Sequence, residues 1–240
     1  MTQSMKQLSL TAASLLLLCG TPASAQMPAP AITKSQVVLR NVISFKTGQE
    51  AAGASAFLLD VRGRTYAVTV KHMLGEDMGV VPPVKPSQVN TQLKQWLFFV
   101  PGTRSVVARA KQLVTPNDNL DVDRIALSLE AGTSAPGISV LKLADIAPKA
   151  GDTLFIMGCL YAEDACHQTT YRVSYLGRQD GYMLVKPIDV IADFAGFSGA
   201  PVVDAEGRAV ALGGGSIAEG TYSGDYIFYS LAGFDKDILN

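Results

Sequence analysis

The sequence carries little net charge and few of the side chains that bind metals. Its 240 residues include 20 Lys and Arg against 21 Asp and Glu, which gives a formal net charge of −1. Proteins that bind nucleic acid normally have an excess of basic residues, so we do not expect nucleic acid as a partner. With two histidines and three cysteines, the chain also has no repeated metal-ligand pattern.

Long apolar runs are absent after residue 25, where no segment approaches the roughly 18 consecutive apolar residues of a membrane-spanning helix. The first 25 residues predict a removable signal peptide, with Lys6, an apolar core from Leu8 to Leu18, and an A-x-A cleavage pattern ending at Ala25. Cys19 does not indicate a lipoprotein, because the large Leu18 precedes it. We therefore expect a periplasmic or secreted protein that has no membrane attachment after cleavage.

Two cysteines, Cys159 and Cys166, remain once the signal peptide is removed. An even pair in an exported protein favours a disulfide, which would close the short loop between them. A metal site is the alternative, since His167 adjoins Cys166. These residues fall short of the four ligands of a structural zinc site, so we expect the disulfide and no metal.

The pattern of the mature chain favours an all-β fold. Short segments rich in Val, Leu, Phe or Tyr alternate with turn residues, as in an antiparallel sandwich or barrel. We expect a short helix at the C-terminus, a single helical turn after residue 72 and a long surface loop at residues 76–94. The expected strands are residues 36–45, 56–61, 65–70, 96–100, 105–113, 125–129, 153–157, 171–175, 182–185, 200–203 and 209–212.

Small and polar residues at 130–137, including Gly and Pro, predict a linker. The linker divides the mature chain into an N-terminal domain at 26–131 and a C-terminal domain at 138–240. Each piece has about 100 residues, a length that suits one small β-barrel.

The segment from Gly196 to Pro201, which reads G-F-S-G-A-P, contains a candidate nucleophile. A serine hydroxyl becomes nucleophilic when a base accepts its proton and N–H groups bind the resulting oxyanion. Glycines near Ser198 let the backbone bend sharply, so the N–H groups of Gly196 and Ser198 can point to one spot and form an oxyanion hole. For this segment alone, a Gly/Ser-rich turn between two strands is an equally good interpretation.

A histidine at the end of an apolar run supplies a candidate base. The run covers residues 66–70, and His72 follows it closely. A strand fixes the position of such a histidine, and its ring can face a cleft and act as a general base. A single histidine is more often a core or surface residue, so the case for His72 depends on its occurring together with the Ser198 segment.

The two segments together resemble the trypsin-like serine peptidases. Residues 57–72 are similar to the G-x-F-L-V…T-A-x-H region of that family, and residues 196–201 to its G-x-S-G-x-P nucleophile loop. Residues 151–158 are similar to the strand that opens its second barrel. The resemblance implies a chymotrypsin-like fold, with two six-stranded antiparallel β-barrels and a cleft between them. It also implies a serine endopeptidase that acts on polypeptides without a cofactor, with His72 and Ser198 in the cleft.

The order of these residues excludes an α/β-hydrolase. That fold uses a G-x-S-x-G elbow and takes its histidine from downstream of the serine. Here Ala200 stands two places after the serine, and both histidines precede Ser198.

The carboxylate that orients the histidine departs from the family pattern. The family usually places an Asp directly before an apolar-Ala-apolar strand, whereas Arg124 precedes that strand here. Asp123 lies one place earlier, and a one-residue offset turns a strand side chain to the other face unless a bulge corrects it. We rank Asp123 first and Asp121 second. A solvated acidic turn without a role in the site is the remaining interpretation.

Activation also differs from the animal-type relatives. Those proteins have an Asp before the nucleophile, which pairs with a newly cut N-terminal amine. Phe197 occupies that position and cannot form an ion pair. The chain therefore resembles relatives that fold directly into an active form.

The resemblance assigns substrate binding to two segments. One contains Ala192, six residues before the serine, where the adjacent Asp193 would favour a basic substrate side chain. The other is the strand containing three glycines that would leave the pocket open, namely Gly213, Gly214 and Gly215.

An inactive relative that binds peptides or a protein partner between the barrels is the competing hypothesis. The displaced carboxylate supports it. The joint presence of His72, Ser198 and the neighbouring glycines opposes it, because a binding protein does not need that combination. We therefore expect an active enzyme.

Overall fold

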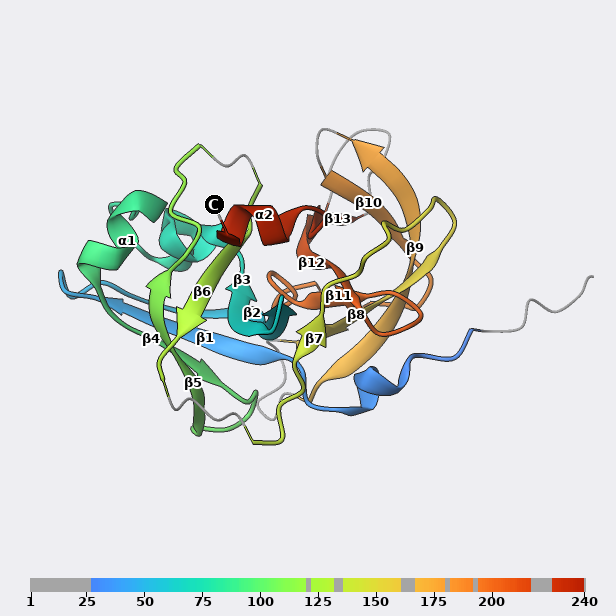
Figure 1. Cartoon of the computed structure of the whole chain (residues 1–240), viewed down its shortest axis with the longest axis horizontal. Helices are drawn as coiled ribbons and strands as arrows, with labels where there is room; N and C mark the ends of the chain where they lie inside the picture. The colour runs from blue at the N-terminus through green and yellow to red at the C-terminus, as the bar shows by residue number, and fades with distance from the viewer. Residues whose placement is uncertain are drawn as a thin grey trace, which may run out of the picture.

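The structure is a computed structural model that describes residues 27–119, 122–131, 136–160, 167–179, 182–191, 194–216 and 226–239. Several predictions fall outside these ranges, namely the signal peptide at 1–25 and the residues Asp121, Cys166, Ala192 and Asp193. In the described part of the chain, two β-barrels lie side by side, the first on the left and the second on the right of Figure 1.

Within the described residues, six antiparallel strands close the first barrel. They follow the order β1-β4-β5-β6-β3-β2, and β2 pairs back onto β1 (Figure 1). A short strand, β7 (Leu141–Lys142), pairs in parallel with β2, beyond the predicted domain boundary at residue 138. The strands of the barrel are β1 (Leu39–Phe45), β2 (Glu50–Val61), β3 (Arg64–Thr69), β4 (Leu93–Phe99), β5 (Val106–Leu113) and β6 (Ile125–Leu129).

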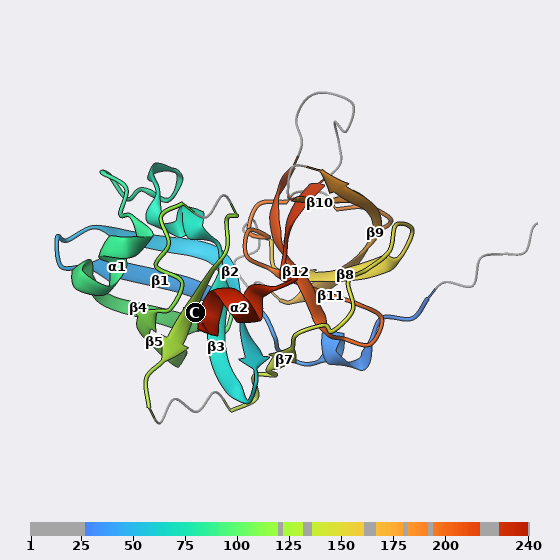
Figure 2. The ribbon, with the colours of Figure 1, turned by 45° about the horizontal axis from the view of Figure 1, so that its top comes forward.

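The second barrel closes through six further strands of the described chain, and Figure 2 shows it as a ring. Their order is β10-β13-β12-β11-β8-β9. The predicted fold of two six-stranded antiparallel barrels is therefore confirmed. The strands are β8 (Thr153–Gly158), β9 (Thr169–Gln179), β10 (Tyr182–Pro187), β11 (Pro201–Val203), β12 (Ala209–Ser216) and β13 (Tyr226–Ser230).

Alternation of buried and exposed residues explains how the strands form barrels. In β5, Ala108, Ala110 and Leu113 are buried, and the residues between them are exposed and polar. The additional exposed residue in this pattern coincides with a register shift between Ala110 and Gln112 against β6. Such a bulge restores the correct face after an inserted residue.

Strand β8 packs the two barrels together. Leu154 and Ile156 contribute to the core of the second barrel, whereas Phe155 and Met157 belong to the buried cluster that includes the core of the first. All four side chains are at most 1% exposed. A strand buried on both faces holds the barrels in one body.

The prediction of a long loop at residues 76–94 is wrong for much of that segment. It contains the helical turn η3 (Glu76–Met78) and the helix α1 (Pro86–Gln92). Pro86 suits the first helical position, where its missing N–H costs nothing. Asn90 in α1 exchanges hydrogen bonds of 2.9 and 2.7 Å with the backbone of Leu113, so a tertiary anchor stabilises this polar helix.

The C-terminal helix α2 (Phe234–Leu239) confirms the helix expected there, and it packs on the first barrel (red in Figure 1). Phe234 is fully buried in the cluster that contains the first barrel's core. Two ion pairs, Arg62–Asp235 and Arg124–Asp237, join the helix to this barrel. No helix in the described residues is long and apolar enough to cross a membrane.

The N-terminal segment, in contrast, packs against the second barrel (blue in Figure 1). It contains the helical turn η1 (Ala31–Lys34). The N–H groups of Val37 and Val38 then donate to Oε1 of Gln168, at 2.8 and 2.9 Å, just before β9. Each barrel therefore binds one end of the described chain.

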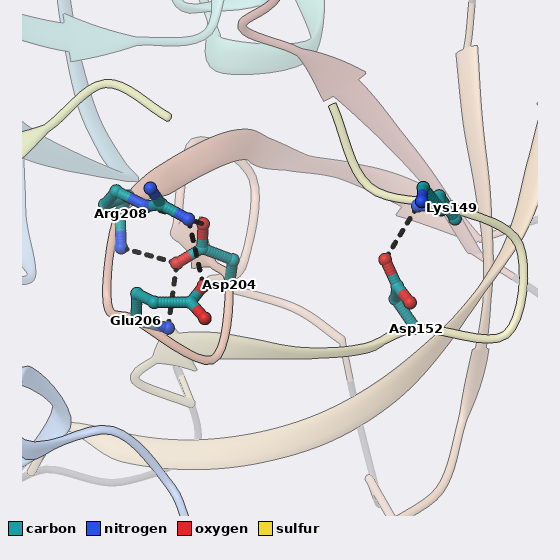
Figure 3. Close-up of polar contacts among 5 residues, drawn as sticks. All are labelled: Lys149, Asp152, Asp204, Glu206 and Arg208. Atoms are coloured by element: carbon teal, nitrogen blue, oxygen red, sulfur yellow. Dashed lines mark hydrogen bonds and ion pairs between the residues drawn. The ribbon is translucent and has the colours of Figure 1, made fainter. Parts of the chain in front are cut away.

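Carboxylates close the turns that precede the two strands pairing with β11. Asp204 accepts the N–H groups of Glu206 and Arg208 at 3.1 and 2.9 Å and pairs with the Arg208 guanidinium (Figure 3). Before β8, Asp152 accepts the backbone N–H of Lys149 at 2.7 Å (Figure 3). These turns place the two strands that pair with β11, the strand directly after Ser198.

Candidate active site

His72 lies just after strand β3 of the first barrel. The strand is buried from Tyr66 to Thr69, and the chain then enters the helical turn η2 (Lys71–Leu74). The next two side chains, Met73 and Leu74, are buried, whereas the side chain of His72 is 28% exposed. The histidine therefore has an anchored backbone and an accessible ring.

Asp123 contacts His72 at two points. Nδ1 of His72 lies 2.5 Å from Oδ2 of Asp123, and the backbone N–H of His72 donates to Oδ1 at 2.7 Å. A carboxylate accepts hydrogen bonds, so this contact favours the tautomer with the proton on Nδ1. Nε2 is then the nitrogen that can accept a proton.

A three-residue turn explains how Asp123 reaches the histidine. The N–H of Arg124 donates to the carbonyl of Val122 at 2.9 Å, which closes a γ-turn centred on Asp123. Strand alternation does not apply at this point, because β6 begins only at Ile125. From the sequence, a β-bulge was expected to bring Asp123 to the histidine, and the structure has a γ-turn there instead.

The inserted Arg124 is buried against helix α2. Its guanidinium lies 2.6 Å from Asp237, its Cζ lies 4.9 Å from the ring centre of Phe234, and its side chain is 9% exposed. Burial lowers the pKa of Arg124, and the bond to Asp237 opposes this by stabilising the charged form. Arg124 thus connects the turn at Asp123 to the C-terminal helix.

The carbonyls of residues 196–198, around the candidate nucleophile, each accept a hydrogen bond. Ser55 in β2 supplies two of them, from Oγ to the Gly196 carbonyl at 2.7 Å and from its N–H to the Ser198 carbonyl at 2.6 Å. The carbonyl of Phe197 accepts the N–H of Ala200 at 2.8 Å. The loop is therefore held by the first barrel as well as by its own turn.

Two N–H groups of this loop remain available. The N–H of Phe197 donates to Phe194 at 3.1 Å, and that of Gly199 donates to Gly213 at 2.8 Å. Within residues 196–200, all of them described, only Gly196 and Ser198 have N–H groups that donate no hydrogen bond to another described residue. Such a pair of unbonded donors can bind an oxyanion.

Glycine is required on both sides of this serine segment. Gly196 has a φ of 97° and Gly199 a φ of 80°, in the left-handed region that favours glycine. A Cβ at Gly199 would also lie 2.1 Å from the carbonyl oxygen of Ser55. A larger residue there would separate the loop from the first barrel.

The hydroxyl of Ser198 donates to the carbonyl of Gly214 at 3.2 Å. Among the described contacts there is no hydrogen bond between this hydroxyl and His72. In free enzymes such bonds are often long or poorly aligned, and they tighten when substrate binds. Rotation about the Cα–Cβ bond of Ser198 redirects the hydroxyl.

The comparisons with known proteins agree with this geometry. Residues 54–212, which include His72, Asp123 and Ser198, match the trypsin-like peptidase domain. The chain belongs to the trypsin-like peptidase family. A search of curated proteins found no match.

Three solved structures, two of them described as serine proteases, share the fold of this trypsin-like protein. The serine endoprotease from Yersinia pestis has a TM-score of 0.56 and 18% identity, over 85% of this chain and 62% of that chain. The thermostable serine protease AL20 from an extremophilic microorganism has a TM-score of 0.61 and 14% identity, over 86% and 96%. The inactive form of Rv3671c from M. tuberculosis H37Rv has a TM-score of 0.54 and 15% identity, over 91% and 94%. This chain thus spans less than two thirds of the Yersinia chain.

Phe197 anchors the nucleophile loop of this trypsin-like protein by packing. Its side chain is fully buried, stacks on Phe194 at 4.9 Å and meets the edge of Tyr171 at 5.7 Å. Gly158 provides the space, because a Cβ there would lie 2.1 Å from the Phe197 ring. Aromatic packing therefore holds the residue directly before Ser198.

The three glycines of β12 have different surroundings. A Cβ at Gly213 would lie 2.4 Å from the Phe197 carbonyl oxygen, and one at Gly214 would lie 2.7 Å from the Tyr229 ring. Around the Cβ position of Gly215, no described atom lies within 4 Å. Open space is thus present at Gly215, whereas the chain itself fills the space at the other two positions. Substrate binding by this strand stays a prediction.

Tyr229 in β13 faces Asp123. Its ring packs against Gly214 and meets Tyr182 edge-on at 5.7 Å. Burial raises the pKa of Tyr229, and the negative charge of Asp123 adds to this effect, so the hydroxyl stays protonated. The Tyr229 ring thus borders both Asp123 and Gly214, the glycine whose carbonyl accepts the Ser198 hydroxyl.

The remaining predicted residues are only partly described. Cys159 is 2% exposed and its sulfur lies 3.6 Å from Arg40, but Cys166 lies outside the described residues, so their disulfide stays a prediction. The described residues contain no group of three or more His, Cys, Asp and Glu that could hold a metal ion.

Sequence reasoning missed Ser55 and Tyr229. Both lie in strands of mainly apolar residues, and each contacts residues more than 100 positions away. No local motif marks either residue.

Proposed function

We propose that this protein is an exported serine endopeptidase, with Ser198 as nucleophile, His72 as base and Asp123 orienting the base. The observation that carries the proposal is the double contact between Asp123 and His72. It fixes the imidazole and leaves Nε2 to accept a proton. Membership of the trypsin-like peptidase family supports a polypeptide substrate.

The reaction begins with rotation of the Ser198 hydroxyl from the Gly214 carbonyl toward Nε2 of His72. Nε2 accepts the hydroxyl proton while Oγ bonds to the carbon of the scissile carbonyl. The electron pair of the C=O double bond moves to its oxygen, where the N–H groups of Gly196 and Ser198 donate to it. Asp123 stabilises the imidazolium that has formed.

Collapse of this intermediate breaks the peptide bond. The imidazolium of His72 gives its proton to the leaving nitrogen, and the acyl group stays bound to Ser198 as an ester. Water then loses a proton to His72 and attacks the ester carbon, and the proton returns to Oγ of Ser198. The enzyme is restored and the second peptide leaves as a carboxylic acid.

Export is a separate part of the proposal and rests on the sequence pattern at residues 1–25. It is tested by the N-terminal sequence of the protein recovered from the periplasm or the medium. A mature chain beginning at Gln26 is expected.

A fluorophosphonate probe tests the site without knowledge of the substrate. An activated serine forms an O–P bond to the probe, and fluoride leaves. Labelling is expected for the wild type and not for Ser198→Ala. Absence of labelling in folded wild-type protein would contradict the proposal and favour a peptide-binding relative without activity.

A further inference from the structure

Ser55 lies 141 residues before Gly196 in the sequence, in a different barrel, and is 2% exposed. Its hydroxyl and its N–H bind the carbonyls of Gly196 and Ser198, as described above. Gly196 and Ser198 are also the two residues of the segment 196–200 whose N–H groups donate no hydrogen bond to another described residue. One residue, through its side chain and its backbone N–H, thus holds the backbone on both sides of the proposed nucleophile.

A bulge in β2 directs Ser55 toward this loop. Arg40 of β1 pairs with Ser55, but the next residue, Asn41, pairs with Gly53, so Ala54 is an additional residue. Ala54 has a φ of 46°, a left-handed conformation that a residue with a Cβ adopts only under strain. Strained residues of this kind persist where the surrounding structure holds them.

A buried polar network holds the bulge. The side-chain amide of Asn41 donates to the Ala54 carbonyl at 3.3 Å and to Oγ1 of Thr69 at 3.0 Å, and it accepts the indole N–H of Trp96 at 2.9 Å. Thr69 in turn donates to the carbonyl of Ser55 at 2.8 Å. The side chains of Asn41, Thr69 and Trp96 are fully buried, and every polar group named here has a partner. A fully satisfied buried network is rigid and fixes one arrangement.

The hydroxyl of Ser55 acts on the peptide plane between Gly196 and Phe197. Ser55 holds the carbonyl end of this plane, and the Phe194 carbonyl holds its N–H end. Gly196 itself cannot restrict the plane, because glycine adopts many backbone conformations. Without the hydroxyl, the plane keeps only the hydrogen bond at its N–H end and can tilt about it, so the neighbouring N–H groups lose their common direction.

We infer that Ser55 is a positioning residue that sets the direction of the oxyanion-binding N–H groups of Gly196 and Ser198. The inference rests on the proposed peptidase function. Ser55 does not touch the substrate; it acts by fixing the loop before the substrate binds. Pre-set donors stabilise the transition state, in which the oxyanion exists, more than the bound substrate.

The variant Ser55→Ala tests this role. Loss of one oxyanion donor costs about 100- to 1,000-fold in kcat, and misdirected donors should cost about 10- to 100-fold. KM should change less than about twofold, because ground-state binding does not use these donors. Both constants are measured with the best peptide from a fluorogenic library selected on the wild type, and the rate of fluorophosphonate labelling should fall in parallel.

Asn90→Ala is the matched control. It removes two hydrogen bonds that join α1 to β5 in the same barrel, away from the nucleophile loop. It should lower the melting temperature without changing kcat. If Ser55→Ala does not fold, Ser55→Cys replaces it, because a thiol keeps the position but donates weakly, and a smaller loss of kcat is expected.

The outcomes separate this inference from the proposed function. If folded wild-type protein does not react with the probe, the peptidase proposal is overturned and the role of Ser55 with it. If the wild type reacts and the folded Ser55 variant keeps its kcat, or changes only in KM, the peptidase proposal stands and the role of Ser55 is overturned. A loss confined to kcat and the labelling rate supports it.

Discussion

Asp123 and Arg124 are adjacent in the sequence, yet their side chains bind different parts of the structure. Asp123 contacts His72 near the nucleophile loop, and Arg124 pairs with Asp237 in the C-terminal helix. The γ-turn that the Arg124 N–H closes produces this division. Arg124, the additional residue before β6, therefore leaves Asp123 within reach of His72 and forms an ion pair of its own.

Asp123→Asn should lower kcat by about four orders of magnitude if Asp123 orients the base, because an amide can stabilise the wrong imidazole tautomer. The measurement is kcat on a fluorogenic peptide, with circular dichroism to verify folding. Asp121→Asn is the control and should have almost no effect. Equal losses from both variants would contradict the assignment.

His72→Ala should abolish turnover and fluorophosphonate labelling and leave the fold intact, because the ring is partly exposed while its backbone is anchored by β3. His167→Ala should have little effect on the rate, since His167 is exposed and lies just before β9. Rates and melting temperatures of both variants decide this. A similar loss from each would show that the histidines have been misassigned.

Asp237→Ala should destabilise the protein by about 3 kcal/mol, because it leaves the Arg124 guanidinium buried without its partner. Asp235→Ala is the matched control in the same helix. Its partner, Arg62, is 68% exposed, so the loss should be at most about 1 kcal/mol. Urea unfolding measures both values, and equal losses would show that burial of Arg124 does not matter.

Tyr229→Phe should make the protein less sensitive to alkali. The raised pKa of Tyr229 means that the folded protein keeps the phenol proton, whereas the unfolded chain releases it near the ordinary value of about 10. Stability from this group is therefore fully present below pH 10 and falls as the pH rises further. Unfolding free energies at pH 9 and pH 11 should differ less for the variant than for the wild type. An equal difference would contradict the raised pKa.

The fold could be predicted because its determinants are local. Each expected strand overlaps an observed one, since β-rich segments and turn residues alternate along the sequence. The strands β7 and β13 were not expected from the sequence. The two residues of β7 form a strand only through pairing with β2. Helix α1 was hidden in a polar, proline-containing segment that depends on contacts of Val89 and Asn90 with the barrel.

The site was predictable only in part, because some of its contacts join residues that are far apart in the sequence. Ser198 and His72 stand in recognisable motifs, and Asp123 could be ranked first by its nearness to β6. The γ-turn at Asp123 could not be foreseen, because its direction depends on the burial of Arg124 against a helix more than 100 residues away. The contacts of Ser55 exist only once both barrels have met.

The packing of α2 on the first barrel also bears on when the protein would acquire the proposed activity during synthesis. Residues 234–239 emerge after every described strand, and until they dock, Arg124 lacks Asp237 and one side of the turn at Asp123 is uncovered. A nascent chain can therefore hold His72 and Ser198 before Asp123 is fixed in place. The proposed peptidase would become competent only after α2 has docked on the first barrel, and polypeptides near an unfinished chain would be spared.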